Sequence, residues 1–126
     1  MTERNTKQKS VILDAVLSAT THPTAEQVYE KVAMQMPNIS LGTVYRNLNK
    51  LAECGQIRKV AVPDRPDRFD RTLHPHNHII CISCGAFGDI EDVPYDTFLS
   101  AGIAKNGFEI IGHETIFFGK CQHCKN

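Results

Sequence analysis

The amino-acid sequence predicts an α+β fold with a helical N-terminal half and a smaller α/β half. Apolar residues recur at helical spacing in three segments before residue 55, and short alternating segments follow them. Two Cys-x-x-C pairs lie in the second half. A chain of 126 residues has room for one ordinary domain or two small ones. A small domain is marginally stable without an additional cross-link, and a structural metal would be one.

The first two helices are separated by a short break. The first is predicted over Gln8–Ala19, and Thr20–Pro23 ends it. Thr24 begins the second, because its side chain can accept a hydrogen bond from the Gln27 amide in a capping box. This helix extends to about Met36. The residues expected to face inward are Val11, Ile12, Ala15, Val16 and Ala19 in the first helix and Val28, Tyr29, Val32 and Met36 in the second.

The third helix is predicted to begin after Ser40, which can cap it, and to end at Cys54. Gly55 then suits the left-handed conformation that follows many helices. We expect Cys54 to be a small core residue. The apolar face consists of Leu41, Val44, Leu48 and Leu51, and the opposite face carries Thr43, Arg46, Asn47 and Lys50.

A β-hairpin is predicted after the third helix, with strands in residues 56–62 and 68–71 around a Pro-Asp-rich turn. Three helices followed by a hairpin form a winged helix-turn-helix domain. Arg46 and Asn47 are residue types that read guanine and adenine edges, and Lys50 can reach phosphate. An ordinary solvated helix face is the alternative. Positive charge on the predicted wing favours DNA, and it comes from Arg58, Lys59, Arg65, Arg68 and Arg71.

Charge is distributed unevenly along a chain whose net charge is zero. Residues 1–71 hold 11 Lys and Arg against 8 Asp and Glu, whereas residues 72–126 hold 3 against 6. This asymmetry is weak support for a nucleic-acid-binding first half.

The second half is predicted as an α/β unit of residues 79–126, after a domain of residues 1–71 and a hinge of residues 72–78. Two short strands are expected in residues 78–83 and 86–90. A helix over Tyr95–Asn106 follows, with Phe98, Leu99 and Ile103 inward, and a longer strand is predicted over Phe108–Gly119.

Two Cys-x-x-C pairs indicate a structural zinc site. Cys81 and Cys84 are separated by 36 residues from Cys121 and Cys124. Four thiolates form a closed tetrahedral site, and such a site stabilises a unit with a small core. Free buried cysteines and a redox dithiol are the alternatives.

A second group of donors combines imidazoles with carboxylates. His76 and His78 are two residues apart, so a strand would project them to one face, and Asp89 follows on the neighbouring strand. His22 and Asp70 belong to the first half. A mixed set suits divalent iron or manganese better than a thiolate set does, although zinc can also bind. Each residue alone is more often a surface group than a ligand.

The segments HPTAEQVYEKV, ISLGTVYRNLNKL, DRFD, HNHIICISCG and GKCQHC resemble the ferric uptake regulator family of dimeric, metal-dependent repressors. The resemblance covers nearly the whole chain. It implies a winged helix that binds palindromic operator DNA and a C-terminal dimerisation domain around a four-cysteine zinc. It also implies a regulatory iron or manganese ion between the domains, on His22, Asp70, His76, His78 and Asp89. Expected DNA contacts are Thr43, Tyr45, Arg46, Asn47, Lys50, Lys59 and Arg65.

Asp70 and Asp89 resemble the peroxide-sensing branch, since iron-sensing members mostly carry Glu at these positions. The resemblance therefore implies a repressor in which bound ferrous iron and peroxide oxidise a ligand histidine, His22 or His76. Two departures are visible. The segment before the first helix is shorter than usual, which puts an N-terminal DNA-contacting arm in doubt. Pro75 and Asn77 stand where ligands of an additional metal site are expected.

Two other functions compete with a peroxide-sensing repressor. One is an iron, manganese or zinc uptake regulator of the same family without oxidative chemistry. The other is a metal-dependent hydrolase, which is weak because no motif places a general acid or base beside the cluster; Glu91 and His113 are only guesses. We expect no enzyme activity. The sequence also lacks a membrane span of roughly 20 apolar residues and a signal peptide, so we expect a cytoplasmic protein with no membrane partner.

Overall fold

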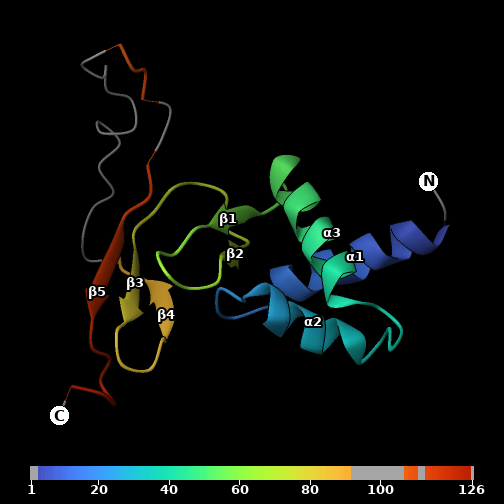
Figure 1. Ribbon diagram of the computed structural model, residues 1–126, viewed down its shortest axis with the longest axis horizontal. Coiled ribbons are helices and arrows are strands. Elements are labelled where there is room, and N and C mark those ends of the chain that lie inside the picture. The colour runs from blue at the N-terminus through green and yellow to red at the C-terminus, as the bar shows by residue number, and fades with distance from the viewer. Residues whose placement is uncertain (1–2, 92–106, 111–112, 126) are drawn as a thin grey trace. The chain divides into compact units, whose positions relative to one another are not determined.

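The computed structural model describes residues 3–91, 107–110 and 113–125, shown in Figure 1. The chain divides into two compact units, Met1–Leu73 and His74–Asn126. The division falls within residues 72–78, for which a hinge is predicted, and the role of a hinge there stays a prediction.

Unit 1 contains three helices and a two-stranded hairpin, which confirms the predicted winged helix. The strands β1 and β2 pair antiparallel, with Lys59 opposite Phe69. The elements are α1 (Glu3–Leu17), α2 (Ala25–Ala33), α3 (Leu41–Glu53), β1 (Arg58–Val60) and β2 (Arg68–Asp70).

Local capping interactions set the ends of α2 and α3. Thr24 and Gln27 form both hydrogen bonds of a capping box, at 2.9 and 3.2 Å. The Ser40 hydroxyl accepts from the Thr43 amide at 3.1 Å. Gly55 follows the last residues of α3 with a φ of 75°, so the predicted left-handed stop is confirmed.

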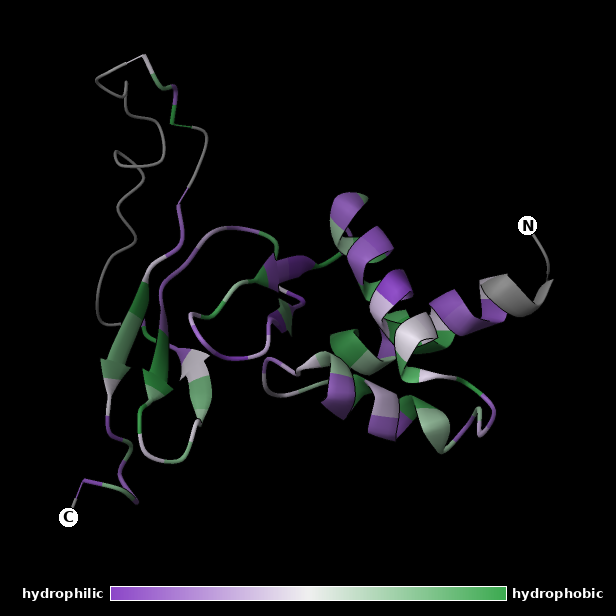
Figure 2. Cartoon of the chain, in the orientation of Figure 1, coloured by the Kyte–Doolittle hydropathy of each residue, from purple (hydrophilic) through white to green (hydrophobic). Residues whose placement is uncertain are grey.

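The core of unit 1 lies where the apolar faces of the three helices meet. Figure 2 shows apolar and polar faces on α2 and α3. Phe69 of β2 is fully buried in the same cluster and ties the hairpin to the helices. Each such side chain contributes about 1.5–3 kcal/mol when fully buried. The central buried residues are Ile12, Val16, Val28, Val32, Val44, Leu48, Leu51, Ile57 and Phe69.

Unit 2 contains a three-stranded sheet with β3 at its centre. The strands are β3 (His78–Cys81), β4 (Phe87–Asp89) and β5 (Ile116–Gly119). β4 pairs antiparallel to β3, and β5 pairs parallel to it. The predicted helix over residues 95–106 lies outside the described residues.

Several predicted boundaries were wrong. α1 begins at Glu3 and ends at Leu17, and α2 ends at Ala33 rather than near Met36. Among the described residues of the long strand predicted over residues 108–119, the strand β5 is formed by Ile116–Gly119. The backbone hydrogen bonds of β5 are made with β3, and this parallel register covers the four residues of β3.

The prediction of Cys54 as a core residue was also wrong, because Cys54 is exposed. It lies at the C-terminal cap of α3, where the chain turns away from the buried face that ends with Leu51. None of the described helices combines the length and apolar character needed to cross a bilayer.

Candidate metal centres and nucleic-acid interface

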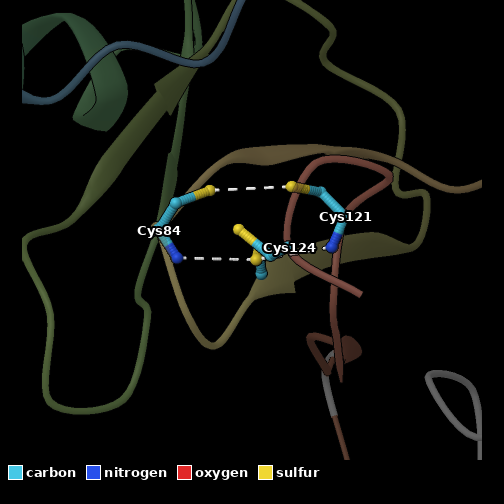
Figure 3. Close-up of side chains that lie close together, drawn as sticks. Cys84, Cys121 and Cys124 are labelled. Atoms are coloured by element: carbon cyan, nitrogen blue, oxygen red, sulfur yellow. Dashed lines mark hydrogen bonds between the residues drawn. The ribbon is translucent and has the colours of Figure 1, made fainter. Parts of the chain in front are cut away.

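The four predicted zinc ligands lie together in unit 2. Their sulfur atoms are all within 4.8 Å of one another. Parallel pairing of β5 with β3 sets Gly119 opposite Cys81, which brings the two Cys-x-x-C turns side by side. In Figure 3 the side chains of Cys84, Cys121 and Cys124 point toward one another.

The spacing of these sulfur atoms fits zinc. A tetrahedral site with Zn–S bonds of about 2.3 Å requires sulfur atoms about 3.8 Å apart. The Sγ atoms of Cys84 and Cys121 are 3.7 Å apart. The cluster can therefore close around one ion with little rearrangement.

Backbone amides and neighbouring thiols shift the pKa values in this cluster in opposite directions. The amides of Cys84 and Cys121 donate to the Cys81 sulfur, at 3.5 and 3.4 Å, and lower the pKa of Cys81 to about 5. Hydrogen bonding to the Cys121 side chain, then to those of Cys84 and Cys81, raises the pKa of Cys124 to about 12. One thiolate thus forms readily, whereas crowding opposes a full set unless a cation neutralises it.

Two of the predicted regulatory ligands form a pair in unit 1. Nε2 of His22 lies 3.1 Å from Oδ2 of Asp70, and both side chains are largely buried. The Thr72 amide donates to the other oxygen, Oδ1, of Asp70 at 2.9 Å. This bond orients the carboxylate, so that Oδ2 faces the imidazole.

The loop that carries His22 is bound to β2. The Phe69 amide donates to the Pro23 carbonyl at 2.9 Å, and Thr24 bridges to Arg68. The guanidinium of Arg68 donates to the His22 carbonyl at 3.0 Å. Arg71 similarly donates to the Leu17 carbonyl at 3.1 Å. Sequence reasoning assigned these two arginines only to wing charge and missed their role as backbone ties.

The other three predicted ligands lie together in unit 2. Antiparallel pairing sets Asp89 opposite His78. Oδ1 of Asp89 is 2.9 Å from Nε2 of His76 and 3.5 Å from Nε2 of His78. The two imidazole rings are 4.4 Å apart between centroids, and the His78 ring stacks on Phe87 at 5.2 Å.

Hydrogen bonding leaves Nε2 of His76 directed at this group. Nδ1 of His76 is 2.9 Å from the His74 carbonyl oxygen, so in the matching tautomer Nδ1–H donates to that carbonyl. Nε2 then carries the lone pair, in the arrangement common for metal-ligating histidines. Two Nε2 atoms and one carboxylate oxygen converging in this way fit a divalent cation.

The polar face of α3 is accessible in unit 1. Tyr45, Arg46 and Lys50 are exposed, and Thr43 and Asn47 are partly so. On the hairpin, Lys59 and Arg65 are exposed. Nζ of Lys59 lies 3.2 Å from Oδ1 of Asn49 and 3.5 Å from Oδ2 of Asp67. Sequence reasoning did not single out Asn49, although its position directly before Lys50 was a possible signal.

A winged-helix unit with a cationic polar face, joined to a unit with a four-thiol cluster, defines the class of metal-responsive DNA-binding regulators. The model of the ferric uptake regulator family matches residues 1–118. The chain therefore belongs to the ferric uptake regulator family. Members of this family are transcription regulators rather than enzymes, which supports a non-enzymatic role.

Individual relatives agree with this assignment. The peroxide-responsive repressor PerR of Staphylococcus aureus is 32% identical over 123 residues, or 98% of this chain and 83% of that protein. The Campylobacter jejuni peroxide stress regulator superposes with a TM-score of 0.71 at 26% identity, covering 96% of this chain and 91% of its own. The Helicobacter pylori ferric uptake regulator Fur shares the fold, with a TM-score of 0.77 at 24% identity over 95% and 81%.

Proposed function

We propose that this chain is a metal-dependent transcriptional repressor that binds palindromic operator DNA as a homodimer and senses peroxide. The family and the peroxide-responsive repressor among its relatives support the general role. The polar face of α3 would enter the major groove, with Arg46 and Lys50 among the contacting residues, and the wing would contribute Lys59 and Arg65 to backbone contacts.

Zinc is proposed to have a structural role on Cys81, Cys84, Cys121 and Cys124. The sulfur spacing supports it. The described part of unit 2 buries few apolar side chains, among them Ile80 and Cys81. Metal binding free energy would therefore be largely folding free energy of this unit.

The regulatory ion is proposed to be held by His22 and Asp70 of unit 1 together with His76, His78 and Asp89 of unit 2. The observation that carries this proposal is that each unit by itself orients imidazole nitrogens toward a carboxylate. Neither set alone supplies enough donors for an octahedral ion, so the two sets are expected to act jointly.

A site shared by two domains couples metal binding to DNA binding. Residues of both units would be held together in one arrangement, and two winged helices of a dimer enter successive grooves only at one separation. The coupling free energy between two such sites is typically about 1–3 kcal/mol. Because coupling is reciprocal, operator DNA should tighten metal binding by the same factor by which metal tightens DNA binding.

Ferrous iron, when bound, would activate peroxide for reaction with a neighbouring imidazole. Overall, one peroxide oxygen would enter a ring C–H bond, the imidazole would supply the two electrons, and the other peroxide oxygen would leave as water. His22 and His76 are the residues expected to gain an oxygen atom. Asp70 and Asp89 carry this part of the proposal, because Asp at both positions is typical of the peroxide-sensing branch. An uptake regulator of the same family would bind metal through the same residues without oxidation.

The test compares the ferrous and manganous forms. A DNA site is first selected from random duplexes with manganese-loaded protein, and binding is measured before and after dilute peroxide, with mass spectrometry of the histidine peptides. We expect metal-stimulated binding by both forms, and loss of binding with oxidised His22 or His76 only in the ferrous form. Equal binding by apo and manganese-loaded protein would contradict metal dependence. An unmodified ferrous form that stays on DNA would indicate an uptake regulator.

A further inference from the structure

The guanidinium group of Arg46 is hydrogen-bonded to its own helix. Nη2 of Arg46 donates to Oγ1 of Thr43 at 3.0 Å. The Thr43 hydroxyl is in turn 2.9 Å from the Ser40 hydroxyl, the cap of α3. Since Thr43 accepts from Arg46, its own O–H can donate to Ser40. The side chains of Arg46, Thr43 and Ser40 are thus linked by consecutive hydrogen bonds along the first turn of the helix.

Gly42 leaves room for this arrangement. A Cβ atom at position 42 would lie 3.5 Å from Nη1 of Arg46, so the guanidinium lies over the backbone of Gly42. A larger side chain at this position would compete with the guanidinium for that space. The lack of a side chain at Gly42 and the acceptor hydroxyl of Thr43 therefore favour the same orientation of the Arg46 guanidinium.

Electrostatics alone would not hold Arg46 in this place. The N-terminus of a helix carries a partial positive charge, which repels a guanidinium by a few tenths of a kcal/mol or more. The Thr43 hydroxyl offsets this repulsion with a hydrogen bond to a charged donor. A hydrogen-bond acceptor on a bound ligand would then lie close to both the Arg46 guanidinium and the partial positive charge of the helix N-terminus.

We infer that Thr43 is a positioning residue for base readout, whose hydroxyl holds the Arg46 guanidinium over the first turn of α3 before DNA binds. Recognition helices contact base edges mainly through their N-terminal residues, so this is where an arginine has to be. The bond to Thr43 uses one of the five guanidinium donors and leaves others for the two acceptors of a guanine. The inference rests on the proposed DNA-binding function.

Asn47 is held in a different way. Its Nδ2 donates to the Thr43 carbonyl at 2.9 Å, so this amide group is engaged by the helix backbone. A bidentate contact with adenine uses both the oxygen and the NH₂ group of Asn. Because Asn47 must reorient and Arg46 need not, the inference assigns preorganised readout to Arg46.

The first experiment measures the order of the Arg46 side chain without DNA. Relaxation of the Arg46 Nε–Hε group is compared in the wild type, Thr43→Val and Thr43→Ser. Val keeps the branched shape and removes the acceptor, whereas Ser keeps the hydroxyl. We expect restricted motion in the wild type and in Thr43→Ser, and an order parameter below about 0.6 in Thr43→Val. Equal mobility in all three would overturn the inference.

The second experiment is a double-mutant cycle on the selected DNA site. Thr43→Val should lower the ratio of selected-site to random-DNA affinity by about threefold to tenfold, the range of one net hydrogen bond. In an Arg46→Ala background the same change should have an effect of less than about twofold. Circular dichroism and zinc content are measured in parallel to verify that the variants fold.

The outcomes separate this inference from the proposed function. If the manganese-loaded wild type selects no DNA sequence, the proposed function fails and the readout role fails with it. If it selects a site but Thr43→Val and Arg46→Ala act additively, only the positioning role is overturned, and Thr43 contacts DNA by itself.

Discussion

The ammonium group of Lys59 on β1 lies 3.5 Å from the carboxylate of Asp67, on the turn that leads into β2. Both side chains are partly exposed, so the pair contributes little to stability. Its effect is instead on the charge that the wing presents. A phosphate that binds Lys59 must compete with Asp67 and with the amide oxygen of Asn49.

This pairing predicts opposite effects of two substitutions on DNA binding. Lys59→Ala should weaken binding to all duplexes and reduce the salt slope by up to about one. Asp67→Ala should strengthen binding to random DNA, because it removes the competing carboxylate. Fluorescence anisotropy at several salt concentrations measures both. Arg65→Ala is the matched control, expected to resemble Lys59→Ala. If Asp67→Ala instead bound random DNA more weakly than the wild type, Asp67 would be shown to orient Lys59 for DNA binding.

Asp89 provides a test of the regulatory site. Asp89→Ala should lose metal-stimulated DNA binding while it keeps the zinc and the dimer, because Asp89 faces His76 and His78 and lies outside the thiol cluster. Glu91→Ala is the control, since Glu91 is an exposed carboxylate two residues further along the chain. Manganese titration by calorimetry and anisotropy on the selected site are the measurements. If both variants lost metal-stimulated DNA binding equally, the cause would be the change in net charge rather than the loss of a metal ligand.

The thiol cluster provides a test of the zinc site. Cys81→Ser or Cys124→Ser should remove zinc and unfold or monomerise unit 2, because three ligands leave the site open and the small core does not compensate. Cys54→Ala should leave zinc content and oligomeric state unchanged, since Cys54 is exposed and outside the cluster. Zinc analysis and analytical ultracentrifugation measure these outcomes. A stable, zinc-free dimer of Cys124→Ser would refute the structural role.

Zinc binding should strengthen as pH rises from 6 to 8. The pKa of Cys124 is raised to about 12, so its proton must be displaced by the metal throughout this range. The pKa of Cys81 is lowered to about 5, so this thiol is already ionised between pH 6 and 8. Cys81 therefore does not contribute to the pH dependence of zinc affinity in this range. One displaced proton corresponds to about tenfold in affinity per pH unit. Competition with a chromophoric chelator measures the slope, and an affinity independent of pH would contradict the prediction.

Much of unit 1 was predictable from local sequence. Thr24 with Gln27, Ser40, and Gly55 after Cys54 are signals whose partners lie within four residues, so the chain forms these caps wherever the helices pack. The apolar spacing of Val44, Leu48 and Leu51 likewise identified the buried face of α3. The spacing of the four cysteines indicated zinc, because ligand type and number are read directly from the chain.

Other features depend on partners that are distant in sequence, and no local pattern encodes them. The parallel pairing of β5 with β3 both brings the two Cys-x-x-C turns together and limits β5 to four residues. The antiparallel register that sets Asp89 opposite His78 comes from backbone hydrogen bonds between strands. The exposure of Cys54 and the tie from Arg68 to the His22 loop follow from how elements pack. Local hydrogen bonds thus define the helices of this protein. The positions of its candidate metal ligands are instead decided by long-range pairing, since that pairing brings donors from separate segments close together.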